Sequence, residues 1–218
     1  MTPQGPFEHQ DEVIIVDYGA GNTGSIENML RRVGARVTVS RKPREVAAAR
    51  SLVLPGVGAF DEAMASLERH ALVKPIQSAT QSGAAVLGVC LGMQLMMENS
   101  EEGVLPGLGL IAGTCERFPS HVAGHRLLVP HMGWGHVRTP NPSDHPQPIF
   151  DTDRRYYFVH SYCVQPQQPR TIYGITDYGI EFVSAIQQDR LTGVQFHPEK
   201  SGIHGLAFFR DYLETDTA

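Results

Sequence analysis

The feature that most constrains this fold is an alternation of short apolar runs with helical patterns through about the first hundred residues. Apolar runs at 13–16, 37–39, 52–54 and 84–89 are each followed by a loop and then by apolar residues at helical spacing. Short runs without polar alternation are typical of strands that are buried on both faces of a parallel sheet. The pattern therefore predicts successive βα units and an α/β fold.

The helical segments between these strands have recognisable ends. The first is expected to stop at Gly34, and Pro43 takes the first position of a short second helix. After the third strand, a single long helical stretch is expected to run through Leu67 and Ile76. These boundaries predict helices between consecutive strands, as a parallel sheet requires.

The second half of the chain changes to short strands with turns, beginning with a predicted strand from Leu108 to Ile111. Asp189-Arg190 is expected to join two late strands as a hairpin, before a closing helix near Leu213. We therefore expect a mixed, largely parallel central sheet flanked by helices, with additional antiparallel strands from the second half. Residues 1–12, polar with two prolines, predict a flexible extension before a single domain at 13–218.

Composition narrows the possible partners and compartment. The 218 residues are 41% hydrophobic, which suits one large domain, and a net charge of −5 without a long basic block disfavours nucleic acid. No run of about eighteen apolar residues offers a membrane span, and the first dozen residues do not resemble a signal peptide. Three scattered cysteines do not form a disulfide framework, so a cytoplasmic location is expected.

Cys90 stands where the fourth apolar run meets a helical pattern, between Gly88 and Gly92. A sharp strand-to-helix turn pushes such a side chain out of the sheet, and a helix start favours its thiolate. We therefore expect Cys90 to be presented as a nucleophile and not buried. A small buried cysteine between two unrelated glycines is the alternative, and this motif alone does not decide between them.

His197-Pro198-Glu199 supplies the groups that would activate a thiol. Residues two apart in extended backbone project to the same side, and the proline fixes the intervening φ, so the imidazole and the carboxylate are expected to converge. A carboxylate holds one ring nitrogen's proton and leaves the other nitrogen free to accept the proton of a thiol. The alternative is a surface histidine and glutamate that merely flank a proline.

The Pro55-Gly56-Val57-Gly58 loop follows the third strand and is expected next to the Cys90 turn. Its glycines let backbone amides face a reacting oxygen, as an oxyanion hole requires, although a plain turn would have the same pattern. Gln94 lies one helical turn after Cys90, where its amide could hold a substrate or simply face solvent. The histidines lack matching cysteine or carboxylate sets, so no metal site is expected.

A glycine-rich loop at 19–24 has the Gly-x-Gly-x-x-Gly spacing of a dinucleotide site and follows a strand. The second strand ends without an acidic residue for a ribose, although Arg41 could face a 2′-phosphate. This loop could therefore belong to an NADP-binding protein, or it could be a tight turn with only a structural role.

Taken as a pair, the segments 88–94 and 193–199 resemble those of class I glutamine amidotransferases, and the likeness spans nearly the whole chain. Further segments at 17–22, 130–134 and 157–162 are similar to those of the glutaminase subunits of imidazole glycerol phosphate synthases, which act in histidine biosynthesis. The resemblance implies glutamine hydrolysis without a cofactor, and it places the 19–24 loop near a partner interface.

The same resemblance assigns roles to individual residues. Cys90 would attack the glutamine amide, His197 would activate the thiol and protonate the leaving ammonia, and Glu199 would orient His197. The oxyanion would be met by the backbone of Leu91 and of Gly56 or Val57. The remaining implied contacts to glutamine come from Gly58, Gln94, His160, Ser161 and Tyr162.

A partner is expected on chemical grounds, because ammonia freed in water is protonated and the chain has no further domain for an acceptor. The resemblance implies a heterodimer with a (βα)8-barrel cyclase, which receives the ammonia and makes imidazole glycerol phosphate and aminoimidazole carboxamide ribotide. Asn22 and Trp134 are expected at that interface, although Trp134 could equally be a core residue. Gly135 departs from the family, which generally has Asn there.

Other functions stay open. The chain could be a glutaminase for another synthase, a non-catalytic module of the same fold, the NADP-binding protein named above, or a cysteine peptidase. If it is a glutaminase, the mobile loop that Gly56 and Gly58 allow predicts weak activity without the partner.

Overall fold

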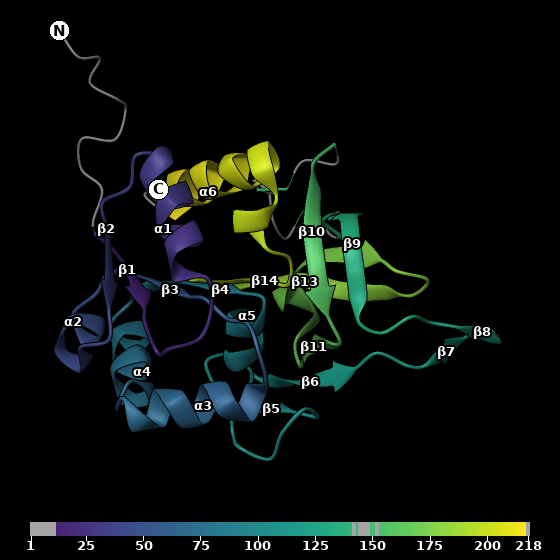
Figure 1. Cartoon of the computed structure of the whole chain (residues 1–218), viewed down its shortest axis with the longest axis horizontal. Helices are drawn as coiled ribbons and strands as arrows, with labels where there is room; N and C mark the ends of the chain where they lie inside the picture. The colour runs from purple at the N-terminus through teal and green to yellow at the C-terminus, as the bar shows by residue number, and fades with distance from the viewer. Residues whose placement is uncertain (1–11, 141–142, 144–148, 151–152, 217–218) are drawn as a thin grey trace, which may run out of the picture.

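The computed structural model describes residues 12–140, 143, 149–150 and 153–216, so all but Glu12 of the predicted extension at 1–12 lies outside the described residues. A seven-stranded sheet forms its centre (Figure 1). Its strands are β1 (Val13–Val16), β2 (Val37–Ser40), β3 (Ser51–Leu54), β4 (Ala85–Val89), β12 (Ile172–Asp177), β13 (Glu181–Gln188) and β14 (Leu191–Val194). Their order across the sheet is β12-β13-β14-β4-β3-β1-β2.

Strand direction divides this sheet into two parts. The pairs β1–β2, β1–β3, β3–β4 and β4–β14 are parallel, whereas β12–β13 and β13–β14 are antiparallel. The predicted mixed and largely parallel sheet is confirmed. Parallel strands end at a common edge, so the loops after β3, β4 and β14 meet there, and these loops carry the candidate site residues.

Helices cover both faces of the sheet (Figure 1). One face carries α1 (Thr23–Arg32) and α6 (Gly202–Asp216), and the other carries α2 (Pro43–Ala47), α3 (Phe60–Arg69), α4 (Val73–Gln81) and α5 (Leu91–Leu95). Side chains alternate across a strand, so Val13 and Ile15 join the core under α1 and α6, whereas Ile14 and Val16 join the core on the other face. The continuous apolar runs are thus explained by burial on both faces.

Further short strands lie outside the central sheet. They are β5 (Asn99–Ser100), β6 (Gly113–Arg117), β7 (His121–Val122), β8 (His125–Arg126), β9 (His131–His136), β10 (Arg155–His160) and β11 (Tyr162–Pro166), with 3₁₀ turns at η1 (Pro169–Thr171) and η2 (Pro198–Lys200). β9 pairs with β10, and β11 pairs with β6, both antiparallel. The β7–β8 hairpin extends away from the body at the right of Figure 1.

Two expected elements were wrong. The long helical stretch through Leu67 and Ile76 is two helices, because Ala71 adopts a positive φ of 53° that breaks the α-helical path. The expected strand from Leu108 to Ile111 is not a strand. Its amides instead donate to the carbonyls of Leu95, Met96 and Met97, which the end of α5 would otherwise leave unpaired.

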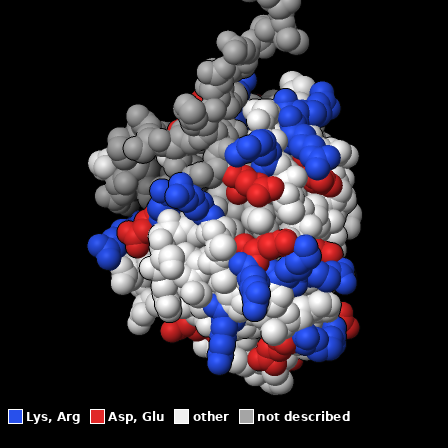
Figure 2. Space-filling view, turned by 90° about the vertical axis from the view of Figure 1, so that its left-hand side faces the viewer, with Lys and Arg blue, Asp and Glu red and all other residues white. Residues whose placement is uncertain are grey.

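Charges of both signs are interspersed on the face that Figure 2 shows, which lies at the left of Figure 1 beside β2 and α2. Lys42, at the start of α2, pairs with Glu45 at 2.8 Å, and on α1 Arg31 pairs with Glu27 at 2.7 Å. Within the part of the chain that the structure describes, no helix is both long and apolar enough to cross a bilayer.

Candidate active site

Cys90 lies on a strained turn between β4 and α5. Its φ of 54° and ψ of −109° fall in a region that side chains rarely adopt, and its amide donates to Val194 O at 2.7 Å. Gly92 is required here, because a Cβ at that position would lie 1.8 Å from Leu54 O. The predicted turn is therefore present. However, Cys90 is only 6% exposed, so the expectation of an unburied thiol was wrong.

His197 reaches Cys90 because β14 lies beside β4, with Val194 opposite Val89. Beyond β14, the His197 amide donates to Tyr157 O at 2.8 Å and fixes the backbone that carries the ring. His197 Nδ1 lies 2.8 Å from Glu199 Oε1, so the expected convergence is observed. Glu199 belongs to the 3₁₀ turn η2, not to the extended backbone that the sequence suggested.

The surroundings of His197 favour its charged form. Burial alone lowers its pKa, but hydrogen bonding and charge from Cys90 and Glu199 outweigh that effect and raise the pKa to about 9. Because a carboxylate only accepts hydrogen bonds, Nδ1 carries the proton that faces Glu199. Nε2 is therefore the ring nitrogen left to interact with Cys90, and it can take a proton from the thiol.

A cavity of about 360 Å³ opens beside Cys90 and His197. It gathers most of the expected substrate and oxyanion residues, and its full lining is Val57, Gly58, Cys90, Leu91, Gln94, Glu102, Pro130, Val159, His160, Ser161, Tyr162, His197 and Lys200. Glu102 is a cavity residue that sequence reasoning missed. Burial raises its pKa although the Phe60 amide, 3.0 Å away, opposes that shift.

The loop after β3 packs directly against the Cys90 turn. A Cβ on Gly56 would lie 2.5 Å from the Gly92 nitrogen, so glycine is needed here for close approach and not for mobility. Gly58 differs, because its φ is 108° and no atom comes within 4 Å of the position of a Cβ. The freedom that the sequence suggested for both glycines is therefore found only at Gly58.

A sequence model described as "Glutamine amidotransferase class-I" matches residues 14–214, more than nine-tenths of the chain. This chain belongs to the class I glutamine amidotransferase family. A Moorella thermoacetica relative, "Imidazole glycerol phosphate synthase subunit HisH", is 44% identical over 93% of this chain and 94% of its own length. An Acinetobacter baylyi relative of the same name is 40% identical over 93% and 97%, respectively.

Solved structures agree on the fold of this amidotransferase. The structure of PurLQS from Thermotoga maritima matches with a TM-score of 0.71 at 15% identity, over 95% of this chain and 99% of that one. The glutaminase domain of Trypanosoma brucei CTPS matches with a TM-score of 0.66 at 16% identity, over 95% and 94%. At such identities the likeness concerns the fold alone.

In this amidotransferase, the side-chain amide of Gln94, which lines the cavity, is held in one orientation. Its Nε2 donates to Tyr162 O at 3.2 Å and to Gln195 Oε1 at 3.0 Å. Both amide hydrogens are therefore used, and Oε1 is left as an acceptor toward the cavity that Gln94 lines. Gln195, a buried neighbour of Cys90, was also missed by sequence reasoning.

Two buried histidines form one wall of the site. His160 Nδ1 donates to Tyr162 O at 2.8 Å, and its Nε2 lies 3.1 Å from His131 Nδ1. Because Nε2 of a neutral His160 accepts, His131 must donate from Nδ1. Burial lowers the pKa of His160 to about 3 and that of His131 to about 4, so both rings are neutral. Among the described residues, no group of three His, Cys, Asp or Glu could hold a metal.

The two expected interface residues lie in different settings. Trp134, on β9, is 52% exposed, which excludes the alternative of a core tryptophan. Asn22 caps α1 by accepting from the Ser25 amide at 3.3 Å. Gly135 lies close to neighbouring side chains, and a Cβ there would be 3.1 Å from Phe158 Cε2.

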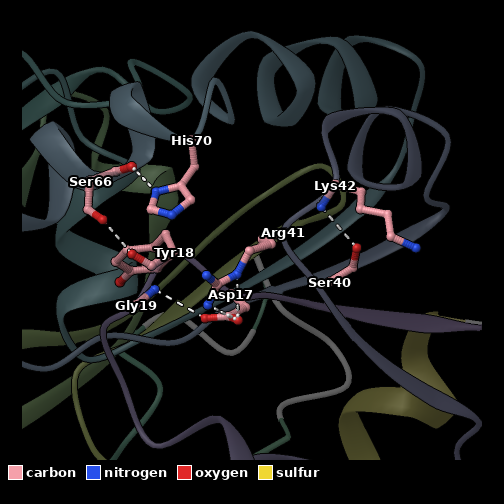
Figure 3. Close-up of polar contacts among 8 residues, drawn as sticks. All are labelled: Asp17, Tyr18, Gly19, Ser40, Arg41, Lys42, Ser66 and His70. Atoms are coloured by element: carbon pink, nitrogen blue, oxygen red, sulfur yellow. Dashed lines mark hydrogen bonds and ion pairs between the residues drawn. The ribbon is translucent and has the colours of Figure 1, made fainter.

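Residues at the start of the 19–24 glycine loop form hydrogen bonds and an ion pair with other residues of the chain (Figure 3). Arg41, which could have faced a 2′-phosphate, binds Asp17 at 2.6 Å, and the Gly19 amide donates to the same carboxylate. Burial alone raises the pKa of Asp17, but these bonds outweigh it and lower the pKa. The hydroxyl of the fully buried Tyr18 donates to Pro55 O, so this loop supports the loop after β3.

Proposed function

We propose that this chain hydrolyses glutamine to glutamate and ammonia through Cys90, His197 and Glu199. The observation that carries the proposal is the buried His197–Glu199 pair beside a thiol on a strained turn, at the wall of a cavity. A buried carboxylate, imidazole and thiol in this order form the arrangement of nucleophilic acyl transfer. Class I family membership supports glutamine as the substrate.

The steps follow from the positions of the groups. His197 Nε2 takes the thiol proton, and the thiolate of Cys90 attacks the side-chain amide carbon of glutamine. The tetrahedral oxyanion is stabilised by the backbone amide of Leu91 and one from Gly56 or Val57. His197 then protonates the amide nitrogen, and ammonia leaves as the carbon–nitrogen bond breaks. Finally, water activated by His197 hydrolyses the thioester and releases glutamate.

Glutamine is selected by polar groups on the cavity wall. The acceptor oxygen of Gln94 suits the two N–H groups of the substrate amide, which glutamate lacks. The carboxylate of Glu102 suits the substrate's ammonium group. Gly58 and the 160–162 segment line the remainder of the cavity and would contact the bound substrate.

The partner in this proposal is the cyclase subunit of imidazole glycerol phosphate synthase, a (βα)8 barrel that forms a heterodimer with this chain in the cytoplasm. The names of the relatives, which are subunits of that synthase, support it. The exposed Met132 and Trp134 on β9 offer apolar contact area close to the cavity. Asn22 would add a polar contact.

Activity of the isolated chain is expected to be low. Gly58 gives the loop after β3 a hinge, and a loop with two orientations can hold its amide away from the oxyanion until the partner shifts the equilibrium. Equal glutamate release with and without the cyclase and its ligand would contradict this.

The direct test is Cys90→Ala in the complex with the cyclase. Glutamate release should fall to background, whereas cyclase activity with added ammonium salt should persist, because only the ammonia source is lost. Cys163→Ala, which changes another buried free cysteine, serves as the matched control and should retain glutamate release. Glutamine-dependent synthesis that survived in Cys90→Ala would exclude the mechanism.

A further inference from the structure

We propose that Gln195 is a further catalytic residue, whose side-chain amide donates a hydrogen bond to the Cys90 sulfur and stabilises the thiolate. Gln195 Nε2 lies 3.6 Å from Cys90 Sγ, and the Gln195 side chain is completely buried. A thiolate is poorly hydrated in such a place and depends on protein donors. The inference rests on the proposed glutaminase function and assigns one more group to the same site.

Backbone hydrogen bonds of the central sheet fix the positions of both Gln195 and Cys90. Gln195 is the first residue after β14, and its amide donates to Ser184 O on β13 at 2.9 Å. The preceding carbonyl, Val194 O, accepts the Cys90 amide at 2.7 Å. The nucleophile and the proposed donor are therefore held together by the ladder that joins β4 and β14.

The direction of the Gln195 amide follows from its neighbours. The Tyr162 carbonyl can only accept, so the group of Gln94 that faces it at 3.2 Å is the NH₂. The second hydrogen of that NH₂ points to Gln195, whose facing atom must be the oxygen, at 3.0 Å. Gln195 consequently turns its own NH₂ toward Cys90. The sulfur thus meets an N–H donor, and this donor is oriented by a residue that lines the substrate cavity.

Two hydrogen-bond donors would then stabilise the thiolate. The charged His197 supplies one through the proton that it takes from the thiol, and Gln195 supplies the other. Tyr18, whose pKa is raised by burial and by the charge of Cys90, is a further titratable group that interacts electrostatically with the thiolate. His160, which is neutral, stands on the cavity wall beside His197.

The test is the alkylation rate of Cys90 by iodoacetamide across pH in Gln195→Met, read by mass spectrometry of the Cys90 peptide. Methionine fills a similar volume without an N–H donor. We expect about tenfold slower alkylation below the midpoint of the pH profile, and a midpoint about one pH unit higher, as for a lost hydrogen bond to a charged group. The loss in kcat/KM for glutamine should narrow as pH rises.

Gln77→Met is the matched control, because Gln77 Nε2 also donates a hydrogen bond, to Leu108 O at 2.9 Å, but Gln77 does not line the cavity. It should leave the alkylation profile unchanged. A Gln195→Met profile that matches the wild type, or a loss of activity equal at every pH, would overturn the proposal. Alkylation needs no glutamine turnover, so this result is separate from that of Cys90→Ala.

A second measurement avoids any effect of Gln195→Met on folding. In the ¹⁵N-labelled wild-type chain, the Gln195 side-chain amide signal should shift with pH as the thiol ionises. In Cys90→Ala, this shift should shrink. Identical titration of that signal in both proteins would also overturn the proposal.

Discussion

His197 and the His131–His160 pair are hidden from solvent to a similar extent, with exposed fractions of 1%, 4% and 6%, yet their pKa values are shifted in opposite directions. His197 faces a carboxylate and a thiol, which favour its charged form. His131 and His160 face each other and a backbone carbonyl, so burial keeps them neutral. Partners, not burial alone, therefore decide which imidazole can exchange protons near neutral pH.

The charged state of His197 and the neutral state of His131 and His160 suit different roles. A charged His197 can stabilise the thiolate and later donate a proton to the leaving group. The neutral pair instead provides fixed donors and acceptors, which order the wall of the cavity around Tyr162 O. A charge on His160 would also oppose the charge on His197, because the two rings interact electrostatically.

The largest expected effect comes from removing the carboxylate beside His197, so that its surroundings resemble the uncharged surroundings of His131 and His160. Cys90 and Glu199 together keep the His197 pKa high; Glu199→Gln removes the second of these charges, and its amide no longer fixes one tautomer. We expect kcat for glutamine hydrolysis to fall by about 10³- to 10⁴-fold, measured as glutamate release, in line with the loss of a triad carboxylate. Glu181→Gln is the matched control, because Glu181 is an exposed carboxylate that pairs with Arg138. Activity within about tenfold of wild type in Glu199→Gln would argue against a triad.

A smaller effect is expected in the pH dependence of unfolding. An unfolded histidine has a pKa near 6.5. Between pH 6.5 and about 9 the folded chain holds more protons through His197, so stability should fall as pH rises through this window. Between pH 6.5 and about 4 the unfolded chain holds more protons at His131 and His160, so stability should fall as pH falls. Urea unfolding should show a maximum near pH 6.5, a loss of roughly 3 kcal/mol by pH 9, and a larger loss by pH 4, where two histidines contribute.

His131→Phe should change the loss of stability at acid pH without changing the loss at alkaline pH. Phenylalanine keeps a ring against Tyr178, whose ring centroid lies 4.0 Å from that of His131, but it cannot be protonated. The acid-side loss between pH 7 and 5 should therefore shrink by roughly half, whereas the alkaline side should not change. An acid limb as steep as that of the wild type would show that other groups cause it.

Local patterns were sufficient to predict much of the site. The strained turn at Cys90 and the pairing of His197 with Glu199 depend on residues within a few positions of each other. The parallel order of β3 and β4 follows the alternating pattern of the first half, whereas β14 comes from the second half, where antiparallel strands were expected, and pairs with β4 in parallel. The catalytic roles themselves remain predictions.

Groups placed by long-range contacts could not be predicted. Glu102 reaches the cavity because its carboxylate accepts from the Phe60 amide, 42 positions away. Gln195 acquires its role through Gln94, 101 positions away. The segment from Leu108 to Ile111 has the apolar content of a strand, but it satisfies the end of α5 instead. Each outcome depends on a hydrogen bond to a residue outside the local sequence pattern.

The central claim is that His197 differs from the other two buried imidazoles in being charged beside Cys90. NMR titration of the ring nitrogens in the ¹⁵N-histidine-labelled chain tests it most directly. The account predicts that His197 titrates with a pKa of about 9, while His131 and His160 keep neutral ¹⁵N shifts until the pH approaches 4. A His197 signal that titrated near pH 6.5 or below, together with charged His131 or His160 at neutral pH, would contradict it.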